Sequence, residues 1–157
     1  MTKTMTLTTL SILLVLSIAC GGKDDVVAVE TPETDHMIAQ ATLTAYYIDA
    51  ALKAGMTTQE INYTLSRVAG GTAISEFWIS DEDGQVEFTN VTGIDFAFPA
   101  DPDADSQAAP FADLLLGGET VVVQEAQPRD TDGALFQYVG VAGVDQPRIV
   151  QVGFDRR

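Results

Sequence analysis

The hydrophobic pattern of the chain changes at Gly70-Gly71, and this change constrains the fold more than any other feature. Before the two glycines, apolar residues recur three and four positions apart, as they do on one face of an α-helix. After them, short runs rich in β-branched and aromatic residues alternate with turn-forming residues, which is typical of strands. Helices followed by strands predict an α+β fold.

Two helices are expected in the first part of the chain. A long helix should begin at Pro32, with Thr31 as its N-cap, and run to about Ala54. Its predicted buried face consists of apolar residues at spacings of three and four, namely Ile38, Ala41, Ala45, Ile48 and Leu52. A second helix should follow Thr57, because Thr57 and Glu60 have the spacing of a capping box.

Five strands are expected after the glycines. Residues 74–80 and 85–89 predict a hairpin, joined by an acidic turn at residues 81–84. Three later strands are predicted, at residues 120–126, 135–141 and 148–154. The simplest way to bury both apolar sets is a five-stranded antiparallel sheet with the long helix and the second helix on one face. The loop at residues 95–110 and a short helix at residues 111–116 should cover the other face or the rim.

Residues 1–19 have the layout of an export signal. Lys3 precedes an apolar run, small residues lead to Cys20, and the sequence then becomes polar. This arrangement resembles the lipobox of bacterial lipoproteins, in which the cysteine is acylated, although Ser17 stands where the box usually has leucine. The alternative is an uncleaved anchor, but the run is shorter than the ~20 residues of a spanning helix. We therefore expect a signal peptide at 1–19, a tether at 20–31 and one domain at 32–157.

The composition argues against several classes of function. A formal net charge of -15 disfavours nucleic acid as a partner. Cys20 is the only cysteine and His36 the only histidine, so disulfides, a cysteine nucleophile and a histidine-based metal cluster are not expected. Asp101, Asp103 and Asp105 match only the start of a calcium loop. Motifs for phosphate binding, zinc proteases and serine hydrolases are missing. We therefore expect no enzyme, no catalytic residue, no metal and no cofactor.

Three strings carry a resemblance to a known family. Residues 74–84 (ISEFWISDEDG), 136–141 (FQYVGV) and 148–153 (RIVQVG) are similar to the first hairpin and the last two strands of Cache domains. These are the PAS-like extracytoplasmic sensor modules of bacterial chemoreceptors and sensor kinases. The resemblance implies a PAS-like sheet and a small-molecule pocket between the sheet and its covering loops. Members of the family bind amino acids, organic acids and other metabolites, so the resemblance does not imply one ligand.

Five residues are candidates for ligand binding, and each has a structural alternative. Trp78 and Tyr138 could form pocket walls or belong to the core. Arg129 and Arg148 could each grip a carboxylate through two parallel hydrogen bonds, or form a salt bridge with a nearby acid such as Asp145. Asp145 itself could receive a ligand amine or stabilise a turn.

The sequence as a whole predicts a lipid-anchored, extracytoplasmic ligand-binding module of the cell envelope. The expected ligand is a small metabolite, an organic acid or an amino acid, and the N-terminal lipid is expected to bind the membrane. Because the chain ends shortly after the last predicted strand, we expect a separate partner, such as a membrane-embedded signalling protein, to receive the bound state. The alternative function is a non-catalytic envelope adaptor that acts through protein contacts.

Overall fold

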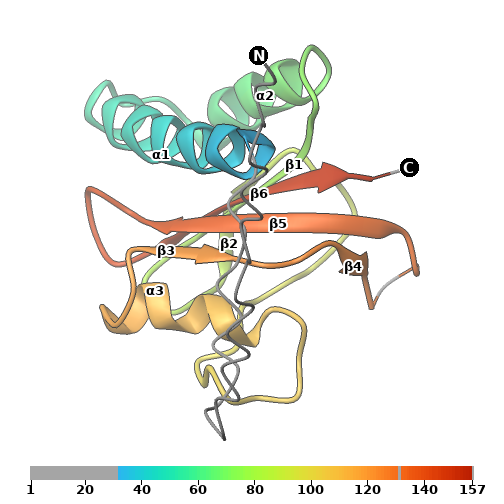
Figure 1. Cartoon of the computed structure of the whole chain (residues 1–157). Helices are drawn as coiled ribbons and strands as arrows, with labels where there is room; N and C mark the ends of the chain where they lie inside the picture. Colours follow the sequence, from blue (N-terminus) through green and yellow to red (C-terminus); the bar gives the residue numbers. More distant parts are fainter. Residues whose placement is uncertain (1–31, 131, 157) are drawn as a thin grey trace, which may run out of the picture.

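A single antiparallel sheet organises the chain, and helices cover both of its faces (Figure 1). The computed structural model describes residues 32–130 and 132–156, so the predicted signal peptide, Cys20 and the tether lie outside the described residues. The described part has an α+β fold, with helices α1 (Pro32–Lys53), α2 (Thr58–Ala69) and α3 (Ala112–Leu116) and a 3₁₀ turn η1 (Ala109–Phe111). None of the described helices is both long and apolar enough to cross a bilayer.

Six strands form the sheet in the described part of the chain. Five of them follow the order β2-β1-β6-β5-β3, and the sixth, β4, also pairs with β5. Their bounds are β1 Ile74–Ser80, β2 Val86–Thr89, β3 Val121–Val123, β4 Gln127–Pro128, β5 Leu135–Ala142 and β6 Ile149–Asp155. The predicted hairpin is confirmed, since β1 and β2 pair antiparallel. Its acidic turn is confirmed too, because the Asp81 carboxylate accepts backbone hydrogen bonds from Asp83 at 3.0 Å and from Gln85 at 2.8 Å.

The strand expected at residues 120–126 is shorter in the structure, where only β3 falls within that range and β4 follows directly after it. Val123 lies opposite Val139, whereas Gln127 lies opposite Phe136, so the strand side has one residue more than β5 between these pairs. Such an extra residue is a bulge, which bends a strand and re-aims its side chains. The Gln124 N–H still donates to the Tyr138 carbonyl of β5 at 2.9 Å, so the extra residue lies between Gln124 and β4.

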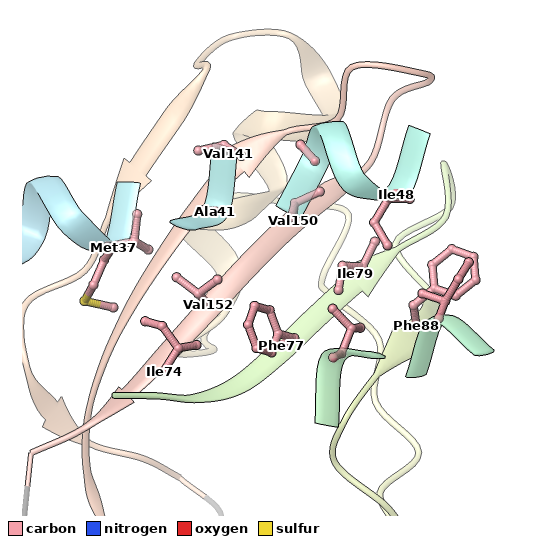
Figure 2. Packing of buried hydrophobic residues seen from close by; sticks show 14 of the residues in the cluster. Met37, Ala41, Ile48, Ile74, Phe77, Ile79, Phe88, Val141, Val150 and Val152 are labelled. Carbon is pink, nitrogen blue, oxygen red and sulfur yellow. The ribbon is translucent and has the colours of Figure 1, made fainter. Parts of the chain in front are cut away.

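Helices α1 and α2 lie over one face of the sheet (Figure 1). Figure 2 shows Met37, Ala41 and Ile48 of α1 together with sheet residues of the same cluster. The main hydrophobic core lies between the two helices and the sheet. It includes the following buried side chains from the sheet: Phe77, Ile79, Phe88, Val139, Val141, Val150 and Val152. These positions alternate along β1, β5 and β6, as expected for one face of a sheet.

The buried face of α1 is rotated slightly from the predicted one. Met37 and Ala51 are buried, whereas Ile38 is half-buried and Leu52 is 36% exposed. Both sets of positions fit a helical period, so the spacing alone does not choose between them. The choice is made by packing on β5 and β6, where the small side chains of Ala41 and Ala45 let the helix approach the sheet closely.

The opposite face of the sheet is covered by α3, η1 and the segment before them (Figure 1). Its side chains form a second, aromatic cluster that includes Trp78, Phe98, Phe111, Phe136 and Tyr138. Gly140 of β5 makes this packing possible, because a Cβ there would lie 2.6 Å from the Phe111 ring. The candidate functional site lies on this face.

Candidate functional site

A cavity of about 120 Å³ lies between the second face of the sheet and its covering segments. Its floor is formed by side chains of the sheet, and its walls by the loop around Phe96, the segment 106–111 and the chain after β3. The lining residues are Glu76, Trp78, Ile94, Phe96, Ser106, Gln107, Ala108, Phe111, Gln124, Arg129, Asp130, Tyr138 and Gln151. An apolar cavity of roughly 150 Å³ admits benzene, so this smaller one limits the enclosed part of a ligand to about the size of benzene or less.

A buried carboxylate, Glu76, lies on the sheet side of the cavity. Glu76 is 7% exposed, and its Oε2 accepts hydrogen bonds from Trp78 Nε1 at 3.0 Å and from the Tyr138 hydroxyl at 2.9 Å. Arg129 Nη1 donates to the other oxygen, Oε1. Since a buried charge is tolerated only when it is paired and hydrogen-bonded, these three donors explain how the carboxylate is kept at the floor.

A glycine in β6 lets Tyr138 reach Glu76. Gly153 lies opposite Glu76 of β1 on one side and opposite Tyr138 of β5 on the other. A Cβ at Gly153 would lie 2.6 Å from Tyr138 Cε1 and 3.2 Å from Glu76 Cβ, so any side chain there would collide with the ring. The tyrosine ring therefore extends across β6, and its hydroxyl meets the carboxylate two strands away.

The Tyr138 hydroxyl is held in its protonated, donating form. Burial raises the pKa of Tyr138 far above its usual range, and the charge of Glu76 raises it further. The phenol consequently remains neutral at any physiological pH and acts as a hydrogen-bond donor to the carboxylate.

Arg129 follows β4 directly, and its backbone N–H is bound to the Ala134 carbonyl at 2.9 Å. The guanidinium makes a bidentate pair with Asp132, with distances of 2.6 Å from Nε and 2.7 Å from Nη2, and also binds Glu76. Its carbon lies 4.2 Å from the centre of the Phe136 ring, a cation–π contact. The hydrogen bond to Asp132 raises the pKa of Arg129, so the side chain is charged, but its charge is already balanced by two carboxylates.

Aromatic rings form much of the cavity wall. Trp78 and Phe96 meet edge to face with ring centres 5.4 Å apart, and Phe96 meets Phe98 in the same way at 5.0 Å. Tyr138 stacks on Phe136 at 5.6 Å. These contacts fix the positions of the rings and give the cavity flat, apolar sides.

Of the five predicted ligand-binding residues, the structure brings three together: Trp78, Arg129 and Tyr138 all line the cavity. The other two, Arg148 and Asp145, are not among the residues that line this cavity. Arg148 is 2% exposed and lies just before β6, where it donates to the Ser80 carbonyl at 3.1 Å and to Asp145 at 3.0 Å. It also binds Glu87 at 3.0 Å. Arg148 therefore ties the β5–β6 turn to the β1–β2 hairpin, and the salt-bridge alternative with Asp145 describes it.

Sequence reasoning missed six polar residues of the cavity: Glu76, Ser106, Gln107, Gln124, Asp130 and Gln151. A signal for Glu76 was present, because a charged residue two positions before Trp78 in an otherwise apolar strand must share the face of the tryptophan. Gln107 and Gln124 lie in a loop and at a bulge, where no periodicity indicates the direction of a side chain.

In the partial calcium loop, Asp101 Oδ1 accepts a hydrogen bond from the Asp103 N–H at 2.9 Å. Within residues 32–130 and 132–156 no group of three potential metal ligands is found. His36 is exposed near the start of α1.

The chain matches no protein-family model, and no curated protein matches it in sequence. Its function is therefore inferred from the geometry of the cavity.

Proposed function

We propose that this protein is an extracytoplasmic, lipid-anchored module of the Cache type that binds a small metabolite and passes the bound state to a separate partner. The observation that carries the proposal is the cavity of about 120 Å³, walled by aromatic rings and floored by the Glu76–Tyr138–Arg129 network. Sites for small molecules are typically concave and mostly apolar, with a few fixed polar groups, and this cavity has that character.

The PAS-like arrangement belongs to the same proposal. Two helices, a hairpin, a crossing segment and a return of strands follow one another along the described chain. The strings that resemble Cache domains coincide with β1 and its turn, with β5 and with β6, and these strands supply Glu76, Tyr138 and Gln151 to the cavity. The long N-terminal helix α1 would then cover the face of the sheet opposite the ligand.

The proposed location depends on Cys20 and the segment before it. Acylation of Cys20 would attach the domain to a membrane outside the cytoplasm, and residues 20–31 would act as the tether. Mass spectrometry of the protein isolated from membranes tests this directly, since a diacylglyceryl group on Cys20 is the expected result and an unmodified N-terminal segment would contradict it. We propose binding rather than catalysis, with no cofactor.

Ligand binding can be tested with the purified protein and a library of organic acids, amino acids and small uncharged amides. A ligand that binds only the folded state at 100 times its Kd adds about 2.7 kcal/mol of stability, which a thermal melt detects. Trp78 is the only tryptophan and lines the cavity, so its fluorescence reports occupancy of this site. We expect at least one compound to raise the Tm and to change the Trp78 emission together.

A pair of matched variants assigns the response to the cavity. Ala108→Phe places a ring in the cavity lining and should abolish the response, whereas Ala50→Phe adds the same ring on the exposed side of α1 and should leave it intact. A library in which no compound changes either signal would refute the proposal.

The alternative function, an envelope adaptor, is supported by apolar side chains on the outside of the helices. Leu43 and Tyr46 of α1 are 64% and 59% exposed, and Tyr63 of α2 is 64% exposed. An adaptor would bind its protein partner equally well with or without the Ala108→Phe substitution. A relay of a ligand-bound state would instead lose its dependence on the ligand in that variant.

A further inference from the structure

One buried amide on the sheet side of the cavity has no hydrogen-bond partner in the described part of the chain. Gln151 of β6 is 5% exposed and lines the cavity. Neither atom of its amide group forms a hydrogen bond within residues 32–130 and 132–156, yet both remain open to a molecule of the size of water. Gln107 Nε2 and Gln124 Oε1 differ in this respect, because protein atoms enclose them. The Gln151 amide is therefore a polar group that a molecule in the cavity can reach.

The strand pattern explains why Gln151 faces the cavity. Its neighbours Val150 and Val152 belong to the main core, so the side chain between them points to the opposite face of the sheet. On the adjacent strands, Gln151 lies opposite Trp78 of β1 and Gly140 of β5. Residues directly opposite each other have Cβ atoms roughly 4.5–5.5 Å apart, so Gln151 and Trp78 are side by side on the cavity floor.

An amide without a protein partner is suited to bind another amide. It carries an N–H donor and a carbonyl acceptor side by side, and a ligand with the same pair of groups can form two hydrogen bonds with it. Since no protein group fixes its orientation, the Gln151 amide can turn to match the order in which the ligand presents donor and acceptor. Buried polar groups in folded proteins nearly always have a partner, so a molecule in the cavity is expected to supply it.

The charges around the cavity disfavour a charged group beside Gln151. The guanidinium of Arg129 is already bound by Asp132 and Glu76. A ligand carboxylate would therefore meet no unbalanced cation among the described lining residues, and the carboxylate of Asp130 would repel it. A cation deep in the cavity would have to pair with Glu76, whose two oxygens already accept three hydrogen bonds. The balance favours an uncharged group.

The walls favour a flat group. Trp78, Phe96 and Tyr138 present aromatic rings to a space of about the size of benzene or less. Exposed Ser106 and Asp130 are part of the lining, so the cavity reaches the surface and the remainder of a larger ligand can extend toward solvent.

We propose that Gln151 determines the specificity of the cavity and that the ligand presents to it an uncharged, planar amide edge, as primary and cyclic amides do. The Gln151 carbonyl accepts from the ligand N–H, and the Gln151 amino group donates to the ligand carbonyl. This inference rests on the proposed function and narrows its ligand from organic acids and amino acids to neutral amides.

Four probes that share a ring test the ligand class by isothermal titration calorimetry on the purified protein. Benzamide has both a donor and an acceptor, acetophenone has only an acceptor, toluene has neither, and benzoate is an anion. We expect benzamide to bind at least about tenfold more tightly than toluene and benzoate, the ratio that two well-placed hydrogen bonds support. Acetophenone, which keeps one of these bonds, should lie between benzamide and toluene.

The variant Gln151→Met assigns this preference to the amide. Methionine keeps the length of the side chain and replaces the amide by a thioether, a weak acceptor without a donor. The affinity for benzamide should fall about tenfold, to that of toluene, whereas the affinity for toluene and the Tm of the free protein should not fall. Gln59→Met makes the same change at an exposed position of α2, over the opposite face of the sheet, and should alter none of these affinities.

The outcomes separate this inference from the function on which it rests. An unchanged benzamide affinity in Gln151→Met would overturn the inference, and so would an equal fall for benzamide and toluene, because Gln151 would then only shape the cavity. If benzoate or another organic acid or an amino acid binds more tightly than the amides, the ligand class is wrong and the binding function stands. If no probe and no library compound binds, both fail, and water satisfies the Gln151 amide.

Discussion

The contact between Gly153, Tyr138 and Glu76 allows a quantitative prediction for Gly153→Ala. The new Cβ would lie 2.6 Å from Tyr138 Cε1, 3.1 Å from Cδ1 and 3.2 Å from Glu76 Cβ. The ring belongs to a central strand and stacks on Phe136, so it cannot move away without losing other contacts. Displacement of the ring would also lengthen the 2.9 Å hydrogen bond from its hydroxyl to Glu76.

The expected loss of stability combines three contributions. Overpacking of a well-packed site costs about 1–3 kcal/mol. Weakening a hydrogen bond to a buried carboxylate adds roughly 1.5–3 kcal/mol. Replacing glycine by alanine in a strand stabilises the fold by roughly 0.5–1 kcal/mol, because the unfolded chain then has less conformational freedom to lose. The net loss in the free energy of unfolding should be about 3 kcal/mol, and urea denaturation should show it as a lower midpoint with an unchanged slope.

Two further variants isolate the cause. In a Tyr138→Ala background the colliding ring is missing, so adding Gly153→Ala should cost less than about 1 kcal/mol. Gly118→Ala is the control, because its Cβ would meet nothing closer than Asp113 Oδ1 at 3.7 Å, an ordinary contact. The reasoning is refuted if Gly153→Ala costs the same with and without the tyrosine, or no more than Gly118→Ala.

Three other predictions follow from burial and charge. Arg148→Ala removes a buried side chain and leaves the Ser80 carbonyl without its donor, whereas the carboxylates of Glu87 and Asp145 are at the surface, so the free energy of unfolding in urea should fall by about 1–3 kcal/mol and the Trp78 response to ligands should not change. Burial raises the pKa of Tyr138, so the stability gained from its neutral form is fully present below pH 10.0, the ordinary value, and declines as pH rises above it. Urea denaturation at increasing pH should therefore show the protein losing stability relative to Tyr138→Phe. Parallel curves of stability against pH for the two proteins would contradict this. Ile48→Ala removes a fully buried core side chain and should cost about 2–5 kcal/mol, against roughly 0.5 kcal/mol or less for Leu43→Ala on the exposed side of the same helix.

The parts of the fold that the sequence predicted are those with a local cause. The capping box at the start of α2 is confirmed, with the Thr57 N–H bound to Glu60 Oε2 at 2.8 Å and the Glu60 N–H bound to Thr57 Oγ1 at 3.3 Å. Its stop at Gly70 is confirmed as well. Each of these features depends on four or five consecutive residues, so it can be predicted without knowledge of the tertiary structure.

The parts that the sequence did not predict depend on contacts between distant segments. The rotation of the buried face of α1, from Ile38 and Leu52 to Met37 and Ala51, is decided by the sheet beneath the helix. The bulge between β3 and β4 depends on the register in which each of these strands pairs with β5. No pattern within either segment carries this information, because the partner strand lies elsewhere in the chain.

Arg129 and Arg148 show why a ligand class is harder to predict than a fold. Both flank strands, and by sequence both could grip an acid, yet Arg129 is bound by Glu76, 53 positions away, and Arg148 by Glu87, 61 positions away. The chain has 23 acidic residues and 8 lysines and arginines, so each cationic side chain has several carboxylates with which it could pair in the folded protein. Four cationic side chains of the described part form ion pairs of this kind: Lys53, Arg129, Arg148 and Arg156. In a chain of this composition a buried arginine is therefore more informative about its internal partners than about a ligand.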